Sequence, residues 1–286
     1  MRAPQNEPLA YDRHMSSIVA KREALLAAVR QLESCAVAFS GGVDSAVVAK
    51  AAAIALGEAA VAVTGTSASL AAGELEAAEE LARLIGIRHV VIPTDELEKS
   101  DYLKNAPDRC YHCKTELYTQ LERLLPTLGV KAIVNGANAD DLGDYRPGMQ
   151  AASEHRIHSP LADCGIAKSD VRELAAGWGL PVWDKPATPC LSSRIAYGEE
   201  VTPERLAMID RAEQFLRSRG LVNLRVRYHR GDLARIEVPP AELPRLASDD
   251  FRRELTAELR QLGFKFVTLV LEGFRSGSLN QLVQIS

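Results

Sequence analysis

Three features are missing from this sequence of 286 residues: a secretory leader, a membrane-length apolar run and an excess of basic residues. The N-terminal stretch MRAPQNEPLAYDRH has no apolar core of a signal peptide, and no later stretch approaches the ~20 apolar residues of a membrane span. Lys and Arg number 34 against 38 Asp and Glu, a net charge of -4, which does not favour binding to a nucleic-acid backbone. We therefore expect a cytoplasmic protein that binds no membrane and, by default, no nucleic acid.

The cysteine count is odd, five in all, which also speaks against a disulfide framework. In a reducing compartment, clustered cysteines are more often metal ligands or reactive groups than cross-links. Cys35 falls in a buried strand pattern and Cys164 in a loop without a cysteine neighbour, so we interpret both as packing or loop residues. Chemistry is therefore expected at Cys110, Cys113 and Cys190.

The first part of the chain alternates short apolar runs with helical patterns. CAVAF at 35–39 is typical of a buried strand, and the Ala- and Val-rich stretch at 46–56 is typical of a helix. This alternation predicts βαβ units, and hence an α/β fold with a doubly wound parallel sheet. Further strands are expected at 60–64, 89–93 and 131–135, and further helices at 11–32, 73–85 and 114–128.

The last third of the chain has an α+β pattern. A helix predicted at 168–178, capped by Ser169, leads into a proline-containing loop at 180–200 that we expect to join two domains. Beyond the loop, a helix capped by Thr202 is expected at 203–219. The remaining predicted elements are strands at 224–229, 234–238 and 265–271 and a helix at 250–263.

These patterns predict two domains, an ATP-binding type of domain over 1–197 and a small α+β domain over 198–286. A unit of that small size is poorly stabilised alone. We therefore expect it to pack on the first domain or on another subunit, and to serve substrate binding or oligomerisation.

SGGVDS at 40–45 lies between a predicted buried strand and a helix. Paired glycines let the backbone approach an anion, and the helix start adds N–H groups and the positive end of its dipole. Walker A is excluded because no Gly-Lys-Ser/Thr follows, so backbone and hydroxyl groups would hold the nucleotide, with Asp44 as the Mg²⁺ ligand. The segment resembles the PP-loop of ATP pyrophosphatases; a glycine turn that binds nothing is the alternative. Its expected ATP contacts are Ser40, Gly41, Gly42, Asp44 and Ser45.

Two later segments, 64–70 and 135–148, follow predicted strands at the carboxyl edge of the sheet, where ligands of such folds bind. Asp140, Asp141 and Asp144 in the second segment supply oxygen atoms for Mg²⁺-pyrophosphate or a cationic substrate, with Asp141 as a substrate contact. The alternative is a solvated loop whose aspartates only cap a turn. The expected ATP contacts are Thr64, Ser67, Gly136 and Asn138.

RCYHCK at 109–114 places a CxxC pair at the entrance to a helix. The helix start and the basic neighbours Arg109 and Lys114 favour thiolate, which suits a metal ligand or a reactive sulfur. A redox pair and half of a structural zinc site remain open, although no second CxxC exists to complete a zinc tetrahedron. The third cysteine of interest, Cys190, lies in KPATPCLSSRIAYG near Lys185 and Arg194, where it would stay available as a nucleophile. A buried, inert cysteine is the alternative.

Arg225 and Arg227 alternate along a predicted strand, so both point to one face. Two guanidinium groups together can bind phosphate or carboxylate, although an exposed strand edge would show the same residues. His155 and His158 lack further ligands nearby, and we interpret them as structural or solvent-exposed.

The order of these motifs resembles the LarE family. SGGVDS, RCYHCK, NADDLGDYRPG, CLSSRIAYGEEVTPE, RVRYHRGDLARIEV and GFRSGSLN follow one another between about residues 18 and 280. LarE proteins are ATP-dependent sulfur transferases of the PP-loop superfamily, which act in making the nickel-pincer nucleotide cofactor of lactate racemase. Homo-oligomers are common in that family.

The resemblance implies a small-molecule nucleotide substrate, pyridinium-3,5-biscarboxylic acid mononucleotide, whose carboxylates become thiocarboxylates. A carboxylate would attack the α-phosphorus of ATP, release pyrophosphate and form an acyl-adenylate, from which sulfur displaces AMP. By position in the matching motifs, Lys114 would neutralise charge near the adenylate. Substrate contacts would come from Ser193, Arg194, Arg225 and Arg227.

The source of the sulfur is where this sequence departs from one form of the family. In the sacrificial form, a single cysteine at the position of Cys190 gives up its sulfur and becomes dehydroalanine. This chain also carries Cys110 and Cys113, and three cysteines can ligate three irons of a [4Fe–4S] cluster while the fourth iron stays open to hydrosulfide. We favour the cluster and keep the sacrificial mechanism as the alternative.

Two other classes of function compete with this prediction. A tRNA thiolase or an amidating synthetase would share the ATP site, but a net charge of -4 argues against tRNA. A non-enzymatic nucleotide sensor would leave the three cysteines unexplained, and pyrophosphate release on adding substrate and ATP would exclude it.

Overall fold

The computed structural model describes residues 7–143 and 147–275, which form two compact units. Unit 1 comprises residues up to 66, 73–94 and 114–188, and unit 2 comprises 67–72, 95–113 and the chain from 189 onward. The expected boundary between 197 and 198 differs from this division. Two excursions from the first unit, around Ala71 and Tyr102, pack into the same apolar core as the C-terminal part of the chain.

Unit 1 is built on a parallel sheet of β1 (Cys35–Ala38), β2 (Ala60–Thr66), β3 (Arg88–Pro93) and β4 (Ala132–Val134) in the order β3-β2-β1-β4. Cys35 pairs with Ala60 on one side and Ala132 on the other. The first three strands step to one side of β1, and the chain then crosses to the opposite side for β4. Ligands of doubly wound folds bind at such a reversal, beyond the carboxyl ends of the strands.

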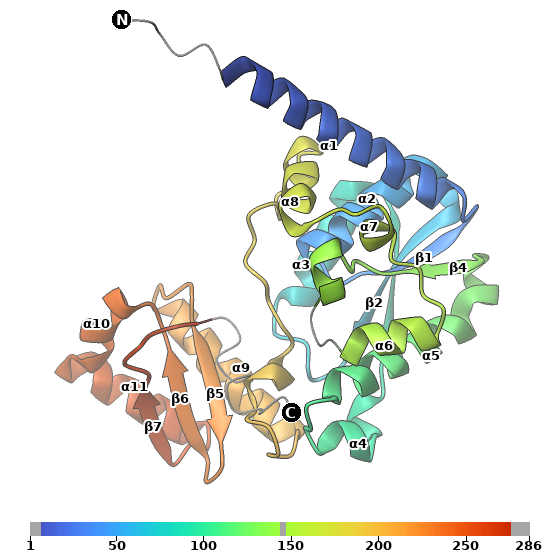
Figure 1. Ribbon diagram of the computed structural model, residues 1–286. Helices are drawn as coiled ribbons and strands as arrows, with labels where there is room; N and C mark the ends of the chain where they lie inside the picture. Colours follow the sequence, from blue (N-terminus) through green and yellow to red (C-terminus); the bar gives the residue numbers. More distant parts are fainter. Residues whose placement is uncertain (1–6, 144–146, 276–286) are drawn as a thin grey trace, which may run out of the picture. The chain divides into compact units, whose positions relative to one another are not determined.

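Helices pack against this sheet and bury its apolar residues. Figure 1 shows α2 (Val43–Leu56) beside the strands. The Ala- and Val-rich sequence of α2 is buried against β1 and β2 on one side and against α1 (Glu7–Arg30) on another. α3 (Glu74–Ile85) packs on β2 and β3, and α8 (Lys168–Gly177) packs on α2. Between β3 and α8 the chain also forms α4 (Ser100–Leu103), which belongs to unit 2, and α5 (Arg109–Leu128), α6 (Pro147–Glu154) and α7 (Pro160–Asp163).

Unit 2 contains a second sheet in the order β5-β6-β7, with β5 (Arg225–His229) antiparallel to β6 (Leu233–Glu237) and β7 (Phe266–Leu269) parallel to β6. α9 (Pro203–Ser218) packs on β5, and α11 (Asp249–Gln261) packs on α9 and β7. A short α10 (Leu243–Ala247) precedes α11. The α/β class with a small α+β unit is thus confirmed.

The helix caps agree with the sequence at one of two predicted positions. Thr202 caps α9, since its Oγ1 accepts a hydrogen bond from Arg205 N at 3.3 Å. Ser169 does not cap α8: the helix already begins at Lys168, and Asp170 Oδ2 accepts from Ala167 N at 2.9 Å. The carboxylate in the first turn takes over the role of the expected hydroxyl. Within the described residues, no helix is long and apolar enough to cross a membrane.

Candidate functional site

The loop between β1 and α2 is closed by its own hydrogen bonds. Ser45 Oγ accepts from Ser40 N at 3.2 Å and donates to Gly42 O at 3.0 Å. Gly41 adopts φ +69°, a left-handed conformation, and an added Cβ there would lie 3.2 Å from Ala78 Cβ. A glycine is therefore required at this position, and the backbone of 40–45 is held around the start of α2, the geometry expected of a phosphate cradle.

Asp44, in the first turn of α2, is held by two side chains from distant parts of unit 1. Asn138 Nδ2 donates to its Oδ1 at 3.2 Å, and Lys168 Nζ lies 2.5 Å from its Oδ2. Asn138 was expected at the ATP site, whereas Lys168 was missed by the sequence analysis. The sequence feature that points to Lys168 is its position at the start of a predicted helix that follows an acidic loop.

The loop after β4 approaches the start of α2 closely. A Cβ on Gly136 would lie 2.7 Å from Ser45 N, so only glycine fits at this position. Asn138 is buried and receives support from Asp141, whose Oδ2 accepts from Asn138 N at 3.0 Å. Asp140 Oδ2 accepts from Lys168 N at 2.9 Å, and Asp144 lies outside the described residues. The acidic residues Asp140 and Asp141 thus shape the loop through hydrogen bonds to backbone N–H groups.

The two remaining predicted ATP contacts, Thr64 and Ser67, belong to different units. Thr64 is buried at the end of β2, where its Oγ1 donates to Phe39 O at 2.8 Å and lies 2.8 Å from His89 Nε2. Ser67 Oγ donates to Glu96 Oε1 in unit 2. The geometry therefore assigns Thr64 to fixing β2 beside β1, and its contact with ATP stays a prediction.

Glu96 is a second residue that sequence reasoning missed. It is 2% exposed, and its Oε1 accepts from both Ser67 and Ser69, the latter at 3.0 Å. Its Oε2 is buried without a hydrogen-bond partner among the described residues. ELEKS holds two glutamates, Glu96 and Glu98, and no sequence signal distinguishes the buried Glu96 from a surface residue.

The three cysteines expected to carry chemistry all lie in unit 2. Cys110 and Cys113 stand in the first turn of α5, exposed and half-buried respectively, and Cys190 is half-buried just before η4 (Leu191–Arg194). Burial raises the pKa of Tyr102, and the Cys190 and Cys113 thiols that face it raise it further. The same tyrosine therefore faces a thiol from each of two distant parts of the sequence.

The other two cysteines differ from these three in position and chemistry. Cys35 is fully buried in β1, which raises the pKa of its thiol to about 12 and keeps it protonated at neutral pH. Cys164 follows α7 in unit 1, and burial, with Asp163 beside it, raises its pKa. Both lie in unit 1, together with residues 40–45, the predicted ATP-binding loop, which we call the ATP loop. Cys110, Cys113 and Cys190 lie in unit 2.

The backbone around Cys190 is held by Arg194, which is fully buried. Arg194 Nη1 donates to Cys190 O at 2.8 Å, and its Nε donates to Glu213 Oε1 at 3.1 Å. Ser193 also donates to Cys190 O, from its N at 3.0 Å and from its Oγ at 2.7 Å. The geometry thus gives Arg194 and Ser193 the role of fixing the Cys190 loop, while their contact with substrate stays a prediction.

Arg225 and Arg227 lie on one face of β5, as their alternation predicts. Arg227 Nη2 lies 3.0 Å from Glu237 Oε2, and its Nη1 donates to Ser193 O at 3.0 Å. Burial and the nearby Arg194 lower the pKa of Arg225 to about 10. Arg227 and Arg217 also lie near Arg225 and add to the positive charge there. This charge suits an anionic ligand, and contact with one stays a prediction.

Lys114 lies in unit 1, with its Nζ 5.9 Å from the centroid of the Tyr118 ring. This is a cation–π contact along one face of α5. The predicted role of Lys114 beside an adenylate stays a prediction.

The described residues contain no group of three or more His, Cys, Asp or Glu side chains close enough together to hold a metal ion. Cys110, Cys113 and Cys190 nevertheless share one unit; Cys190 and Cys113 lie near the buried Tyr102, and Cys190 and Cys110 lie near the buried Arg109. Three thiol ligands are the donor set that iron–sulfur clusters use. The three cysteines thus supply the right kind of donor atom, and a cluster bound by them stays a prediction.

Known proteins are similar to this chain over most of its length. Residues 20–134 match the family model described as asparagine synthase. An uncharacterized protein from Synechocystis is 47% identical over 88% of this chain and 94% of its own length. The pyridinium-3,5-bisthiocarboxylic acid mononucleotide synthase of Lactiplantibacillus plantarum is 38% identical over 93% of this chain and 96% of its own length.

A more distant relative is similar to about half of the chain. The tRNA-specific 2-thiouridylase of Xanthobacter autotrophicus is 31% identical over 52% of this chain and 48% of its own length. The full-length similarity and the loop geometry at 40–45 point to one family. The chain therefore belongs to the LarE family of ATP-dependent sulfur transferases, within the PP-loop superfamily.

Proposed function

We propose that this protein adenylates the carboxylates of pyridinium-3,5-biscarboxylic acid mononucleotide and converts them to thiocarboxylates for the nickel-pincer nucleotide cofactor. The observation that carries this proposal is the similarity, over 93% of the chain, to a pyridinium-3,5-bisthiocarboxylic acid mononucleotide synthase. Lactate racemase is the expected user of the finished cofactor.

The ATP half of the reaction is assigned to unit 1. Backbone N–H groups of 40–45 would bind the phosphates, and Asp44 would bind Mg²⁺ once its pairing with Lys168 is broken. Lys168 would then be free to neutralise phosphate charge beside the same loop. These groups favour attack of the substrate carboxylate on the α-phosphorus because they stabilise the charge of the departing pyrophosphate.

The sulfur half is assigned to the three cysteines of unit 2. In this proposal Cys110, Cys113 and Cys190 would hold a [4Fe–4S] cluster, which would supply the hydrosulfide-level sulfur that takes the place of AMP on the substrate carbonyl. The alternative is the sacrificial mechanism, in which Cys190 itself attacks the acyl-adenylate and loses its sulfur. Both versions need the Cys190 loop held in place, as Arg194 and Ser193 hold it.

The negative groups of the substrate nucleotide are assigned to the arginines of β5. Arg225 and Arg227 share one face of the strand, and Arg225 keeps a positive charge at neutral pH because its pKa lies at about 10. Ser193 and Arg194 would contribute next to Cys190, and Asp141 is a further proposed substrate contact. Homo-oligomerisation and hydrosulfide as the donor belong to the same proposal.

The test combines iron analysis with the mass of the intact chain before and after turnover. Anoxic reconstitution with iron and sulfide is expected to give about four irons per chain, pyrophosphate release on adding substrate and ATP, and an unchanged protein mass. A protein that binds no iron and loses the mass of hydrogen sulfide at Cys190 would establish the sacrificial version instead. Absence of pyrophosphate release with this substrate would refute both.

A second candidate follows from the match to the tRNA-specific 2-thiouridylase, which covers 52% of this chain. In that case, uncharged tRNA would stimulate pyrophosphate release, and a gel shift that weakens with salt would accompany it. The small-molecule substrate would then have no effect.

A further inference from the structure

A row of buried polar contacts joins two segments of unit 2 that are far apart in the sequence. We call Tyr102, Asn105 and Arg109 the polar seam. Tyr102 Oη lies 2.6 Å from Ser192 Oγ, and Asn105 Nδ2 donates to Ala196 O at 2.8 Å. The segment that carries Cys110 and Cys113 is therefore fastened to the loop that carries Cys190.

Arg109 makes the contact of the seam that lies nearest to the cysteines. The residue immediately precedes Cys110 and is only 5% exposed. Its Nη1 donates to Asn105 Oδ1 and, at 2.8 Å, to Ser192 O, two residues after Cys190. One guanidinium group thus bridges both cysteine-bearing segments.

The charge of Arg109 has no carboxylate beside it in the described part of the chain, where its partners are an amide oxygen and a carbonyl oxygen. A buried cation without a counter-charge is costly. Burial by itself would lower the pKa of Arg109, but the facing Cys190 and Cys110 side chains reverse this, so its pKa lies above the ordinary value. An anionic group held between the two cysteine-bearing segments would therefore meet a buried positive charge that no carboxylate of the described residues offsets.

We propose that Arg109 is a positioning residue for sulfur transfer, which holds the segments of Cys110 and Cys190 in one frame and places a buried positive charge between them. The inference rests on the proposed function, since it assumes that these thiols act together. In the cluster version, three thiolates and a bound hydrosulfide concentrate negative charge in a half-buried region, where a fixed cation is most effective.

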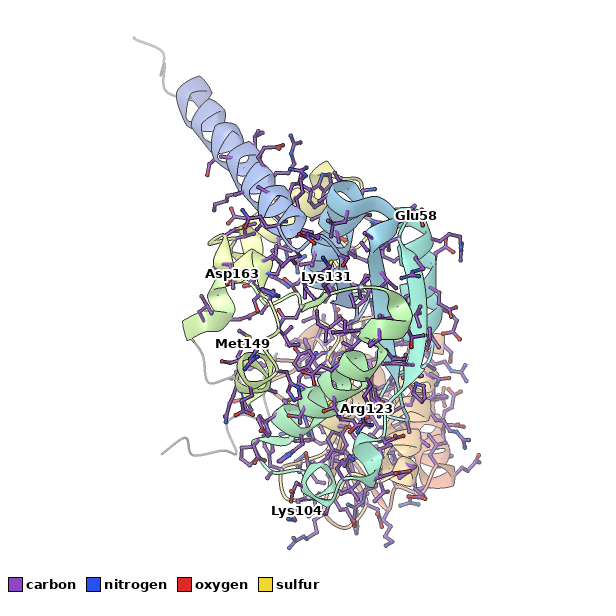
Figure 2. All side chains as sticks on the ribbon, turned by 90° about the vertical axis from the view of Figure 1, so that its right-hand side faces the viewer. Glu58, Lys104, Arg123, Lys131, Met149 and Asp163 are labelled. Atoms are coloured by element: carbon purple, nitrogen blue, oxygen red, sulfur yellow. The ribbon has the colours of Figure 1, made fainter. Side chains whose placement is uncertain are left out.

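The test compares Arg109→Met, which removes the charge at similar size, with Arg109→Lys, which keeps it. Arg123→Met is the matched control, because Arg123 is exposed on the same helix α5 (Figure 2). The first readout uses the iron-free full chain under anoxic conditions: the rate at which a short bifunctional thiol reagent links Cys190 to Cys110 or Cys113, measured by peptide mass spectrometry. We expect this rate to fall about tenfold in Arg109→Met and less in Arg109→Lys.

The second readout is the reduction potential of the reconstituted cluster, followed by spectroelectrochemistry. Loss of a nearby positive charge disfavours the added electron, so the potential should become more negative in Arg109→Met and stay near the wild-type value in Arg109→Lys. Tyr102→Phe removes another contact of the seam without changing charge, and it should leave the potential unchanged.

Either of two results would overturn the inference. One is wild-type cross-linking and potential in Arg109→Met; the other is an equal shift of potential in Tyr102→Phe, which would mean that the seam acts only through packing. If Arg109→Met fails to fold, Arg109→Lys carries the test alone. A tenfold slower cross-linking together with a more negative potential in this variant, which keeps the charge, would then overturn the inference. Failure of the proposed function looks different, since the wild-type chain itself would then take up no iron and transfer no sulfur, while the cross-linking rates would still report on Arg109.

Discussion

The ATP loop of unit 1 and the Cys190 loop of unit 2 are held in place by different means. Residues 40–45 close on themselves through Ser40, Gly42 and Ser45, so the loop that is proposed to bind phosphate also determines its own shape. The Cys190 loop is instead held largely by side chains, by Arg194 and Ser193 from within the loop and by the buried Arg109 from a segment 83 residues before Ser192. A phosphate cradle consists of backbone, whereas a sulfur donor needs a fixed backbone and an available side chain.

The largest effect on either loop is expected from Cys190→Ser, which removes the thiol of the Cys190 loop. Sulfur transfer should fall about a thousandfold or more, because the atom that carries or ligates the sulfur is gone. ATP binding, measured by calorimetry, should stay at the wild-type level because unit 1 is untouched. Cys164→Ser is the matched control and should transfer sulfur normally; retention of transfer in Cys190→Ser would contradict the assignment.

The corresponding change in unit 1 is Asp44→Asn. Loss of the carboxylate should slow pyrophosphate release about a hundredfold, because the Mg²⁺ that stabilises the departing pyrophosphate is bound less well. Labelling of Cys190 by a monofunctional thiol reagent should be unchanged. Asp163→Asn, an exposed position in the same unit, serves as the control, and equal activity of the two variants would remove Asp44 from the site.

Glu213→Gln tests whether the Cys190 loop depends on a buried charge pair. Glu213 and Arg194 are both fully buried, so removing one charge should lower the free energy of unfolding by about 3–5 kcal/mol. Glu254→Gln is the control: its pair with Arg219 is largely solvated and should contribute less than about 1 kcal/mol. Urea unfolding of the two variants measures both values, and similar values would show that burial does not matter here.

Gly136→Ala tests how tightly the ATP loop is enclosed. The new Cβ would lie 2.7 Å from Ser45 N, which forces the backbone apart and should cost about 1–3 kcal/mol along with weaker ATP binding. Gly177→Ala, at the end of α8, meets no atom within 4 Å and should be neutral or slightly stabilising. Thermal unfolding with and without ATP separates the two cases; equal behaviour would contradict the close approach.

The smallest expected effect is a pH dependence of stability from His229 in unit 2. Burial, with Arg235 and Arg227 nearby, lowers the pKa of His229 below 6.5. The unfolded chain then binds the proton more readily, so His229 favours stability above the unfolded pKa and loses this contribution as the pH falls. The slope of unfolding free energy between about pH 7 and pH 5 should be shallower in His229→Gln; an unchanged slope would exclude this histidine as its source.

The local pattern of the sequence predicts most of the elements closely. The strand expected at 35–39 is β1 at Cys35–Ala38, and the helix expected at 203–219 is α9 at Pro203–Ser218. Apolar periodicity and the Thr202 cap are local signals, because the residues that produce each of them lie within a few positions of one another in the sequence. The ATP loop could be found for the same reason, since SGGVDS is contiguous.

Long-range partners could not be predicted in this way. Lys168 meets Asp44 across 124 residues, and Arg194 meets Glu213 in a core whose existence depends on how unit 2 assembles. The same reason explains the domain boundary: nothing local in 95–113 indicates that it packs with the C-terminal part of the chain. A buried charge pair and a surface charge are identical in sequence and differ only in what the fold places beside them.

The contacts described around Cys190 have a consequence for the life of the protein. Arg194 and Ser193 hold its carbonyl oxygen, so the shape of the loop is stored in the main chain and not in the sulfur atom. In the sacrificial version, a chain that has lost the sulfur of Cys190 would still offer Arg194 and Ser193 the carbonyl oxygen of that residue. The sulfur atom that is transferred and the groups that hold the loop are therefore different parts of the molecule.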